Sequence, residues 1–282
     1  MHPSGVARTA RNHVHRSTAG LAVPHPTLPP KLSSAAQART QSRKPQILYE
    51  DNKALVINKP SNCSLQGQHG TTARNNWNGL LQYLRQRPES PEVFPVHRLD
   101  KATTGTLLLA KNRVQAKALA KAFTNHQVKR QYLAVVSGRI KLGYTDTVEA
   151  HLRVDDDKVR VTTKDDQAAL ASRTFWRCLS SSSTHSLLCL EPETGRKHQL
   201  RVHCSLVLKA PIVGDFKYGH LAQVPGLASD AMLLHAYSLS FYIWKKDGKR
   251  VEIRSVAPPP RTFARFCREH GLELPEDTPL QD

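Results

Sequence analysis

The fold is decided by the stretch VHRLDKATTGTLLLAKN, residues Val96–Asn112. Its second half contains Thr106–Ala110, a short and nearly all-apolar run, which is typical of a strand buried on both faces. The residues just before it, Asp100–Gly105, include Asp, Thr and Gly, which favour turns and caps. We therefore expect a loop that enters a buried strand and holds Asp100, two residues after Arg98, on a rigid scaffold.

The residues alone leave the role of Asp100 open. A carboxylate held in such a loop can be catalytic. It can equally form a structural ion pair with Arg98, or accept hydrogen bonds from loop amides beside Thr103 or Thr104. Most neighbouring pairs of Arg and Asp are structural, so the wider sequence has to decide between these hypotheses.

Hydrophobic periodicity predicts an α+β domain built on a mixed, largely antiparallel sheet. Most predicted strands neighbour each other in the sequence, and Lys246-Asp247-Gly248 is a strong hairpin signal. Residues 61–78 are polar and are expected to form a loop. The predicted strands are 47–49, 54–58, 106–110, 131–136, 147–154, 158–163, 170–178, 185–191, 233–244 and 249–256. The predicted helices are 79–86, 113–126, 197–208 and 261–270.

The chain is strongly basic, with 41 Lys and Arg against 23 Asp and Glu, a formal charge of +18. Seven of the basic residues precede Glu50, the first acidic residue, and without them the body still carries +11. A charge of this size indicates a polyanionic partner, either nucleic acid or an acidic membrane surface. A merely soluble basic surface is the plainer alternative.

Residues 1–45 are predicted to be a disordered leader, followed by a single catalytic domain over residues 46–282. The leader has no acidic residue, contains Arg8, Arg11 and Arg16, and is rich in Ser, Thr and Ala, as in an organellar transit peptide. A basic arm that contacts RNA is the alternative. We expect no separate RNA-binding module between the leader and Ile47.

Cysteine and histidine patterns predict no metal site and no disulfide framework. The five cysteines show no C-x-x-C spacing, and His198, His203 and Cys204 lack the spacing of a metallohydrolase helix. No run of residues approaches the roughly 18 apolar residues that span a bilayer, so no membrane partner is expected. A monomer is the default expectation.

Five segments, in one order along the chain, resemble the motifs of the RluA-type RNA pseudouridine synthases. They are VHRLDKATTGTLLLAKN at 96–112, KRQYLAVVSG at 129–138, TGRKHQLRVH at 194–203, PIVGD at 211–215 followed by Tyr218-Gly219, and LHA at 234–236. Thr104 stands where Ser is usual, Thr106 stands where an aliphatic residue is usual, and one extra residue separates Lys129 from Tyr132. The chain's small size is similar to that of fungal mitochondrial ribosomal RNA members.

The resemblance implies the pseudouridine synthase fold and an isomerase that detaches uracil from ribose, turns it over and rejoins it through carbon five. Such a reaction needs a carboxylate with a cationic neighbour and a platform for the flipped base, and no cofactor. Asp100 matches the catalytic aspartate, Arg201 its basic partner and Tyr132 the active-site tyrosine. The plainer alternatives are a phosphate contact for Arg201 and a core position for Tyr132. The sequence leaves open whether Asp100 attacks the base, attacks the sugar or abstracts a proton.

Substrate-binding residues are predicted partly from the resemblance and partly from their position in the chain. Arg98 is expected to fill the space that the uridine leaves, or else to hold the loop. Arg196 and Lys197, where the chain enters the predicted helix 197–208 and its first amides face solvent, are expected to bind a backbone phosphate. Lys59 in a Lys-Pro pair, and His97 beside Arg98, complete the predicted RNA-binding set.

The leading hypothesis is a mitochondrial pseudouridine synthase that acts on large-subunit ribosomal RNA, with mitochondrial tRNA as the alternative substrate. A catalytically silent RNA-binding or ribosome-assembly factor is the alternative from another class. Such a factor would have no need to retain Asp100, Tyr132 and Arg201 together.

Overall fold

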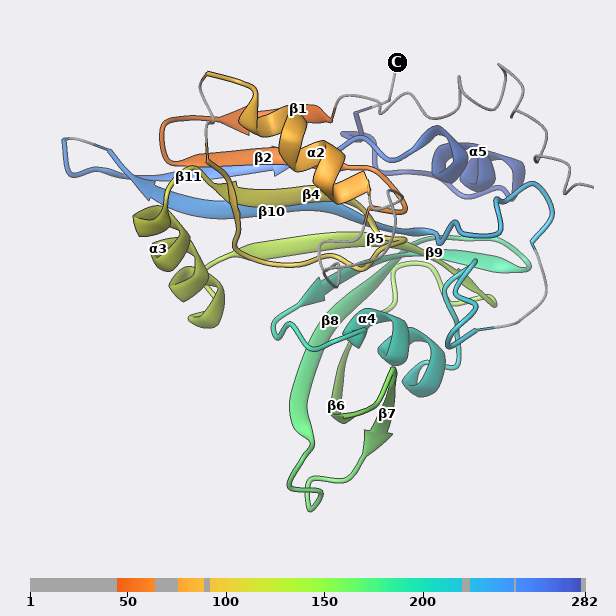
Figure 1. Ribbon diagram of the computed structural model, residues 1–282. Helices are drawn as coiled ribbons and strands as arrows, with labels where there is room; N and C mark the ends of the chain where they lie inside the picture. Colours follow the sequence, from red (N-terminus) through yellow and green to blue (C-terminus); the bar gives the residue numbers. More distant parts are fainter. Residues whose placement is uncertain (1–44, 64–75, 89–91, 220–223, 246, 280–282) are drawn as a thin grey trace, which may run out of the picture. The chain divides into compact units, whose positions relative to one another are not determined.

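The computed structural model describes residues 45–63, 76–88, 92–219, 224–245 and 247–279 (Figure 1). Residues 42–282 form one compact unit. The predicted leader, apart from Pro45, and residues 64–75 of the predicted loop lie outside the described residues.

The described chain forms an eleven-stranded sheet in the order β1-β2-β4-β10-β5-β9-β8-β6-β7, with β11 paired to β10 and β3 paired to β4. The strands are β1 (Gln46–Glu50), β2 (Ala54–Lys59), β3 (Phe94–Pro95), β4 (Thr104–Ala110), β5 (Lys129–Ser137), β6 (Thr145–Asp155), β7 (Lys158–Thr162), β8 (Leu170–Ser181), β9 (His185–Pro192), β10 (Leu234–Trp244) and β11 (Arg250–Val256). Among the described strand pairs, β4 with β10 is parallel and the rest are antiparallel. The predicted mixed, largely antiparallel sheet is confirmed.

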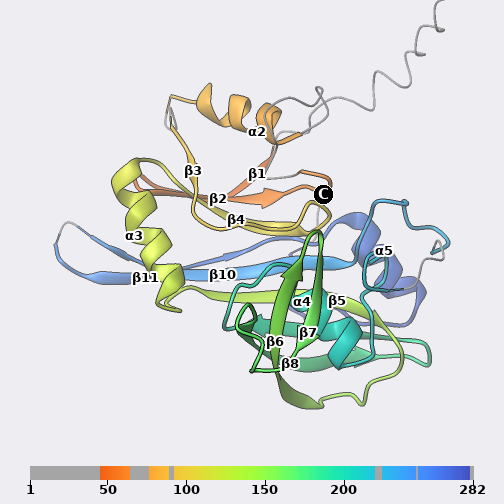
Figure 2. The same cartoon turned by 60° about the horizontal axis from the view of Figure 1, so that its bottom comes forward.

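The helices cover both faces of this sheet. They are α2 (Asn76–Arg85), α3 (Arg113–Thr124), α4 (Gln199–Val202) with the π-helix η1 (His203–Val207), and α5 (Arg261–Glu269). Leu84 of α2 and Leu200 of α4 join one core cluster with Tyr132 of β5. Alternate strand residues point to the opposite face, where Leu119 of α3 and Phe263 of α5 belong to two further clusters. In Figure 2 the β6–β7 hairpin and α4 lie side by side at one end of the sheet.

The parallel strands β4 and β10 pair over a short length and then separate. It pairs at Thr104 and Gly105 only, and farther along β4 the two-residue strand β3 pairs with Leu109 and Ala110. Between these points the backbone N–H of Leu108 donates to Nε2 of His97 at 2.9 Å. The segment that leads to Asp100 therefore runs along the open edge of β4. A strand this short, containing a proline, carries no periodic signal, so β3 has no counterpart among the predicted strands.

His97 is a packed and neutral part of this edge. Its ring stacks on Phe123, with ring centroids 4.6 Å apart. Burial, with a smaller effect of the Arg130 charge, lowers the pKa of His97 to about 3. The imidazole is therefore uncharged at neutral pH, as acceptance of the Leu108 N–H requires.

The predicted start of the central strand at Thr106 is wrong by two residues. β4 already begins at the buried Thr104, because Thr104 and Gly105 pair with β10. Gly105 has φ +109°, and a Cβ there would lie 2.1 Å from the carbonyl oxygen of Ala236. Only glycine permits this approach of the two backbones.

The predicted helix over 197–208 is also wrong in its first residues and in its type. His198 adopts a left-handed conformation with φ 52°, so α4 begins at Gln199. The chain then continues as η1, in which the N–H of Leu208 donates to the carbonyl of His203. The buried His203 ring bonds to Ser172 and Thr174 of β8 at 2.8 and 3.0 Å, and these bonds fix the helix against the sheet.

The remaining predicted elements are present with shifted ends. The predicted helix 79–86 starts three residues earlier, at Asn76. The hairpin signal is confirmed, since Trp244 pairs with Arg250 across the turn and Gly248 has φ +78°. Among the residues that the structure describes, the helices are too short or too polar to cross a membrane.

Candidate active site

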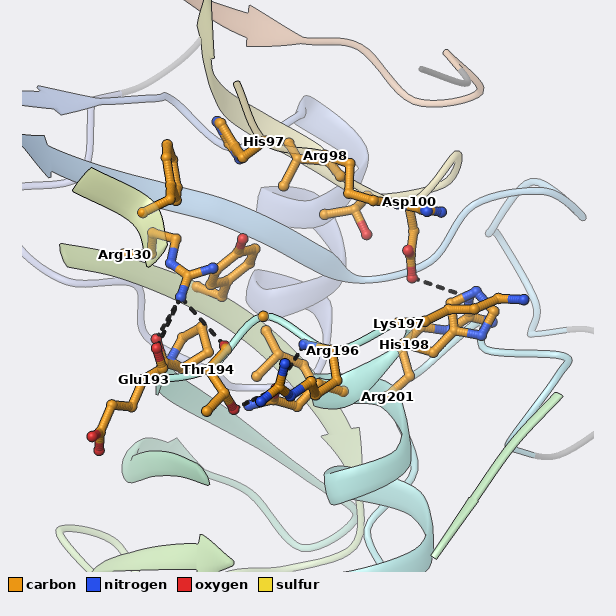
Figure 3. A pocket seen from close by; sticks show the side chains of 18 of the residues that line it. His97, Arg98, Asp100, Arg130, Glu193, Thr194, Arg196, Lys197, His198 and Arg201 are labelled. Carbon is orange, nitrogen blue, oxygen red and sulfur yellow. Dashed lines mark hydrogen bonds and ion pairs between the residues drawn. The ribbon is translucent and has the colours of Figure 1, made fainter. Parts of the chain in front are cut away.

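A cavity of about 600 Å³ opens between the loop before β4, the end of α3, the start of β5 and the loop from β9 to α4 (Figure 3). It brings together seven of the eight predicted site residues. These are His97, Arg98, Asp100, Tyr132, Arg196, Lys197 and Arg201. Lys59 does not line the cavity.

Asp100 and Arg201 meet in this cavity from opposite sides, as predicted. Nη1 of Arg201 donates to Oδ2 of Asp100 at 3.2 Å, and both side chains are largely buried (Figure 3). In the described chain Asp100 forms its ion pair with Arg201 and not with Arg98. The alternative of a structural pair between neighbours in the sequence is therefore wrong.

Asp215 fixes the guanidinium of Arg201. Its Oδ2 accepts from Nε at 2.8 Å and its Oδ1 accepts from Nη2 at 2.7 Å. Burial opposes the charge of Arg201, but the bonds and charges of Asp215 and Asp100 outweigh it and raise the pKa of the guanidinium. Asp215 was not among the predicted site residues, although it lies in the motif PIVGD. The available signal was an acidic residue directly after an apolar segment of a motif.

Lys59 lies beneath the loop that carries Asp100. Its fully buried ammonium donates to the carbonyl oxygens of Pro60 and Cys63, both at 3.0 Å, and of Lys101 at 3.2 Å. Burial lowers the pKa of Lys59 to about 8, although the nearby Cys63 and Asp100 act in the opposite direction. Lys59 thus ties the first strand hairpin to the residue after Asp100, a structural position from which it does not reach the cavity.

His198 and Tyr218 form a second pair beside Arg201. The Tyr218 hydroxyl accepts the backbone N–H of Val159 at 2.9 Å and forms a hydrogen bond of 2.7 Å with Nδ1 of His198. Burial lowers the pKa of His198 to about 4, with Asp100 acting against this shift and Arg201 adding to it. The guanidinium of Arg201 also lies over the Tyr218 ring, 5.1 Å from its centroid. Sequence reasoning missed both residues, because their pairing depends on the turn at His198.

Tyr132 and Arg130 share one face of β5 and line the cavity together. Alternation along the strand puts Arg130, and not the exposed Lys129, on the face of Tyr132. The basic residue that accompanies the tyrosine is therefore Arg130, two positions before it. Counting from Arg130 instead of Lys129 removes the extra residue noted in the sequence motif. Burial raises the pKa of Tyr132, so its hydroxyl is protonated at neutral pH.

Arg130 holds the loop that follows β9. Its Nη2 donates to the carbonyl oxygens of Pro192, Glu193 and Thr194 at 3.0, 3.4 and 3.3 Å (Figure 3). Its guanidinium lies 5.8 Å from the centroid of the Phe123 ring. This one side chain joins β5, α3 and the loop at the cavity wall.

Arg196 and Lys197 line the cavity but also bind the β6–β8 strands. Nε of Arg196 donates to the carbonyl of Ala171 at 3.0 Å, and Nζ of Lys197 to that of Asp156 at 3.4 Å. The backbone N–H of Arg196 donates to Oε1 of Gln199 at 3.0 Å. The start of α4 therefore offers fewer free amides than a helix beginning at Lys197 would.

Arg98 is an exposed cation in the lining of the cavity. Within the part of the chain that the structure describes, its side chain has no hydrogen bond and no ion pair. Its neighbour His97 faces the other way, into the β4 edge and Phe123.

Sequence comparisons identify proteins that are similar to this chain. Residues 53–206 match the family described as RNA pseudouridylate synthase. A tRNA pseudouridine synthase C from Haemophilus ducreyi is 34% identical over 210 residues, covering 69% of this chain and 84% of that protein. A ribosomal large subunit pseudouridine synthase D from Vibrio vulnificus is 33% identical over 246 residues, covering 80% and 73%. RNA pseudouridine synthase 4, mitochondrial, from Arabidopsis thaliana is 34% identical over 233 residues, covering 73% and 48%.

A solved structure shares the fold. Human RNA Pseudouridylate Synthase Domain Containing 4 superposes with a TM-score of 0.65 and 28% sequence identity, covering 86% of this chain and 98% of that chain. The large mixed sheet with few helices is thus a known fold, in agreement with the prediction.

Proposed function

Because the chain belongs to the RNA pseudouridylate synthase family, it is an RNA pseudouridine synthase, an isomerase, and we propose that it modifies a uridine of mitochondrial large-subunit ribosomal RNA. The reaction breaks the bond between N1 of uracil and C1′ of ribose and forms one between C5 and C1′. The C5 proton is lost and N1 gains a proton, so no co-reactant is consumed. The chain has only to flip, hold and turn the base.

The observation that carries the site assignment is the shared guanidinium of Arg201. Asp215 holds two of its nitrogens at 2.8 and 2.7 Å, and the third faces Asp100 at 3.2 Å. A cation fixed in this way places the Asp100 carboxylate at a constant position in the cavity. We assign Asp100 as the catalytic carboxylate and Arg201 as its partner.

Tyr132 supports the flipped base in this proposal. Its ring belongs to the main core cluster, so it offers a rigid surface on which uracil can stack. Its hydroxyl is protonated at neutral pH and can exchange a proton with the base as the bonds change.

The cations at the rim support binding of the surrounding RNA. Arg98, exposed and unpaired in the described chain, has the flat guanidinium that can take the place of an extruded base. Arg196 and Lys197 are placed to contact phosphates, although each already donates to a backbone carbonyl.

The choice of substrate and compartment rests on the relatives and on the leader. The Vibrio relative is named for the large ribosomal subunit, and the Arabidopsis relative is named as mitochondrial. The acid-free composition of residues 1–45 supports import into mitochondria. Mitochondrial tRNA is the second candidate, because the Haemophilus relative is named a tRNA synthase. The likeness to fungal members rests on chain length alone.

The test is pseudouridine mapping by carbodiimide modification and primer extension on mitochondrial RNA. Cells would carry the intact protein, Asp100→Asn, or Asp165→Asn as a matched control. Asp165 is exposed and lies outside the cavity lining, so the control makes the same chemical change away from the site.

We expect one stop in large-subunit ribosomal RNA to vanish with Asp100→Asn and to remain with Asp165→Asn. A stop lost from a tRNA instead would replace the substrate proposal and keep the role of Asp100. An unchanged map with Asp100→Asn would refute the catalytic assignment.

A further inference from the structure

The helix α3 carries three basic residues at intervals of four, Arg113, Lys117 and Lys121, and all three are exposed. We call them the α3 stripe. At about 100° per residue they lie within an arc of roughly 80° on the side of the helix opposite Leu119, which packs on the sheet. No acidic residue occurs in the sequence of this helix.

The stripe is unfavourable for an isolated helix. Like charges at i and i+4 repel by about 0.2–0.5 kcal/mol per pair, and an arginine in the first turn opposes the helix dipole. Lys117 and Lys121 form no ion pair with any residue that the structure describes, and Arg113 lies over the Phe94 ring, 5.6 Å from its centroid. The two lysines therefore have no acidic partner among the described residues, and an external anion would complement their charge.

The stripe leads directly to the cavity. Thr124, at the end of α3, lines the cavity and lies at an angle on the helix between Arg113 and Lys117. In Figure 2 α3 runs down to the start of β5, where Arg130 and Tyr132 form the cavity wall. The stripe is therefore a continuous extension of the proposed active site, about 16 Å long from Arg113 to Thr124.

The two sides of the cavity differ in how freely their cations can bind phosphate. On the side of the loop after β9, Arg196 and Lys197 donate to carbonyl oxygens, and Lys197 also lies near Asp157. On the α3 side the two lysines are unpaired in the described chain. Together with Arg98, these lysines are the exposed cations beside the cavity that we consider available to a phosphate.

We propose that the α3 stripe binds the sugar–phosphate backbone of the RNA strand that flanks the reacting uridine. This inference rests on the proposed function, since it identifies the path of the substrate away from the cavity. The contacts are to phosphates, so they add affinity without sequence preference.

The experiment compares Lys117→Gln/Lys121→Gln with Arg139→Gln/Lys141→Gln in the full chain. Glutamine keeps the helix propensity and removes the charge. Arg139 and Lys141 are exposed and follow β5 at the end far from Arg130, so the control removes the same two charges at a distance. Binding of a short fluorescein-labelled oligouridylate is measured at several salt concentrations by fluorescence anisotropy, and turnover is measured at saturating substrate RNA.

Each phosphate contact to a single strand contributes about 0.7 to the slope of log affinity against log salt. We expect the α3 variant to lose about 1.4 from this slope, so that a fourfold rise in salt weakens its binding about sevenfold less than that of the intact protein. Its turnover at saturating RNA should stay within about twofold of the intact rate, and the control variant should keep the intact slope.

Three results would overturn the inference: an intact slope in the α3 variant, the same loss of slope in the control, or no binding of oligouridylate by the intact protein. If the intact protein forms no pseudouridine while the α3 variant still loses slope, the proposed function fails and the stripe stands as an RNA contact. The two proposals are thus tested separately.

Discussion

Asp215 accepts two hydrogen bonds from Arg201, from Nε at 2.8 Å and from Nη2 at 2.7 Å, and so directs the remaining nitrogen at Asp100. Oδ1 of Asp215 also accepts the backbone N–H groups of Lys217 and Tyr218. The carboxylate that orients the guanidinium is therefore itself fixed by its own loop.

Asp215→Asn should impair both catalysis and stability. An amide cannot accept both guanidinium bonds, so Arg201 would shift relative to Asp100. A displacement of this kind can cost about 100-fold in rate. Breaking a buried pair costs about 3 kcal/mol at the lower end of measured values. Single-turnover kinetics and urea unfolding would measure the two effects, and a normal rate in a folded variant would contradict a positioning role.

Tyr132→Phe should separate the contribution of the aromatic ring from that of the hydroxyl group. The ring would still pack in the core and stack on the base, so RNA affinity should change little. If the hydroxyl moves a proton, the rate should fall about 100-fold. A near-normal rate would leave the ring as the only important part. Single-turnover rates at several RNA concentrations would distinguish these outcomes.

The stability of the protein should depend on pH through Lys59. Its pKa is about 8 in the folded chain and near the ordinary 10.5 when unfolded. Between these values the unfolded state binds more protons, so the free energy of unfolding rises with pH by about 1.4 kcal/mol per unit. This contribution is present above the unfolded pKa and is lost as pH falls through 8.

Lys59→Met provides the comparison for that titration. The variant lacks the group, so the difference in unfolding free energy between it and the intact protein should change with pH from about 8 upwards. Parallel stability profiles, measured by urea unfolding at several pH values, would show that Lys59 titrates normally.

Gly105→Ala should strongly destabilise the fold. A methyl group would lie 2.1 Å from the carbonyl oxygen of Ala236, at φ +109°. We expect a loss of about 3 kcal/mol or more. Gly138→Ala is the matched control, because Gly138 has φ +104° and nothing within 4 Å of its added methyl. It should lose only the strain of its backbone, about 1–3 kcal/mol. Equal losses in urea unfolding would contradict the role of the contact with β10.

The sequence predicted the features that depend on local pattern. The apolar run before Lys111 predicted the buried strand β4, and the spacing of Leu119 and its neighbours predicted α3. The motifs predicted the meeting of Asp100 with Arg201, which lie 101 residues apart in the chain.

Features that depend on tertiary contacts were not predicted. Asp215 could not be linked to Arg201 from spacing, since the two meet only after η1 turns the chain back. His97 carries the same sequence signal as Arg98, but only the tertiary contacts show that His97 packs on Phe123 and accepts the Leu108 amide while Arg98 stays exposed. The π-helix likewise follows from bonds between His203 and β8 that no local pattern encodes.

The bond from the Leu108 amide to the His97 side chain ties the segment before Asp100 to the edge of β4. The Leu108 amide hydrogen can exchange with solvent only when the His97 ring leaves it, by rotation of that side chain or by movement of the segment before Asp100. A single backbone amide in the core thus reports on how often His97 and the segment before Asp100 move away from β4. Amide exchange could therefore follow this movement in the free enzyme without any substrate.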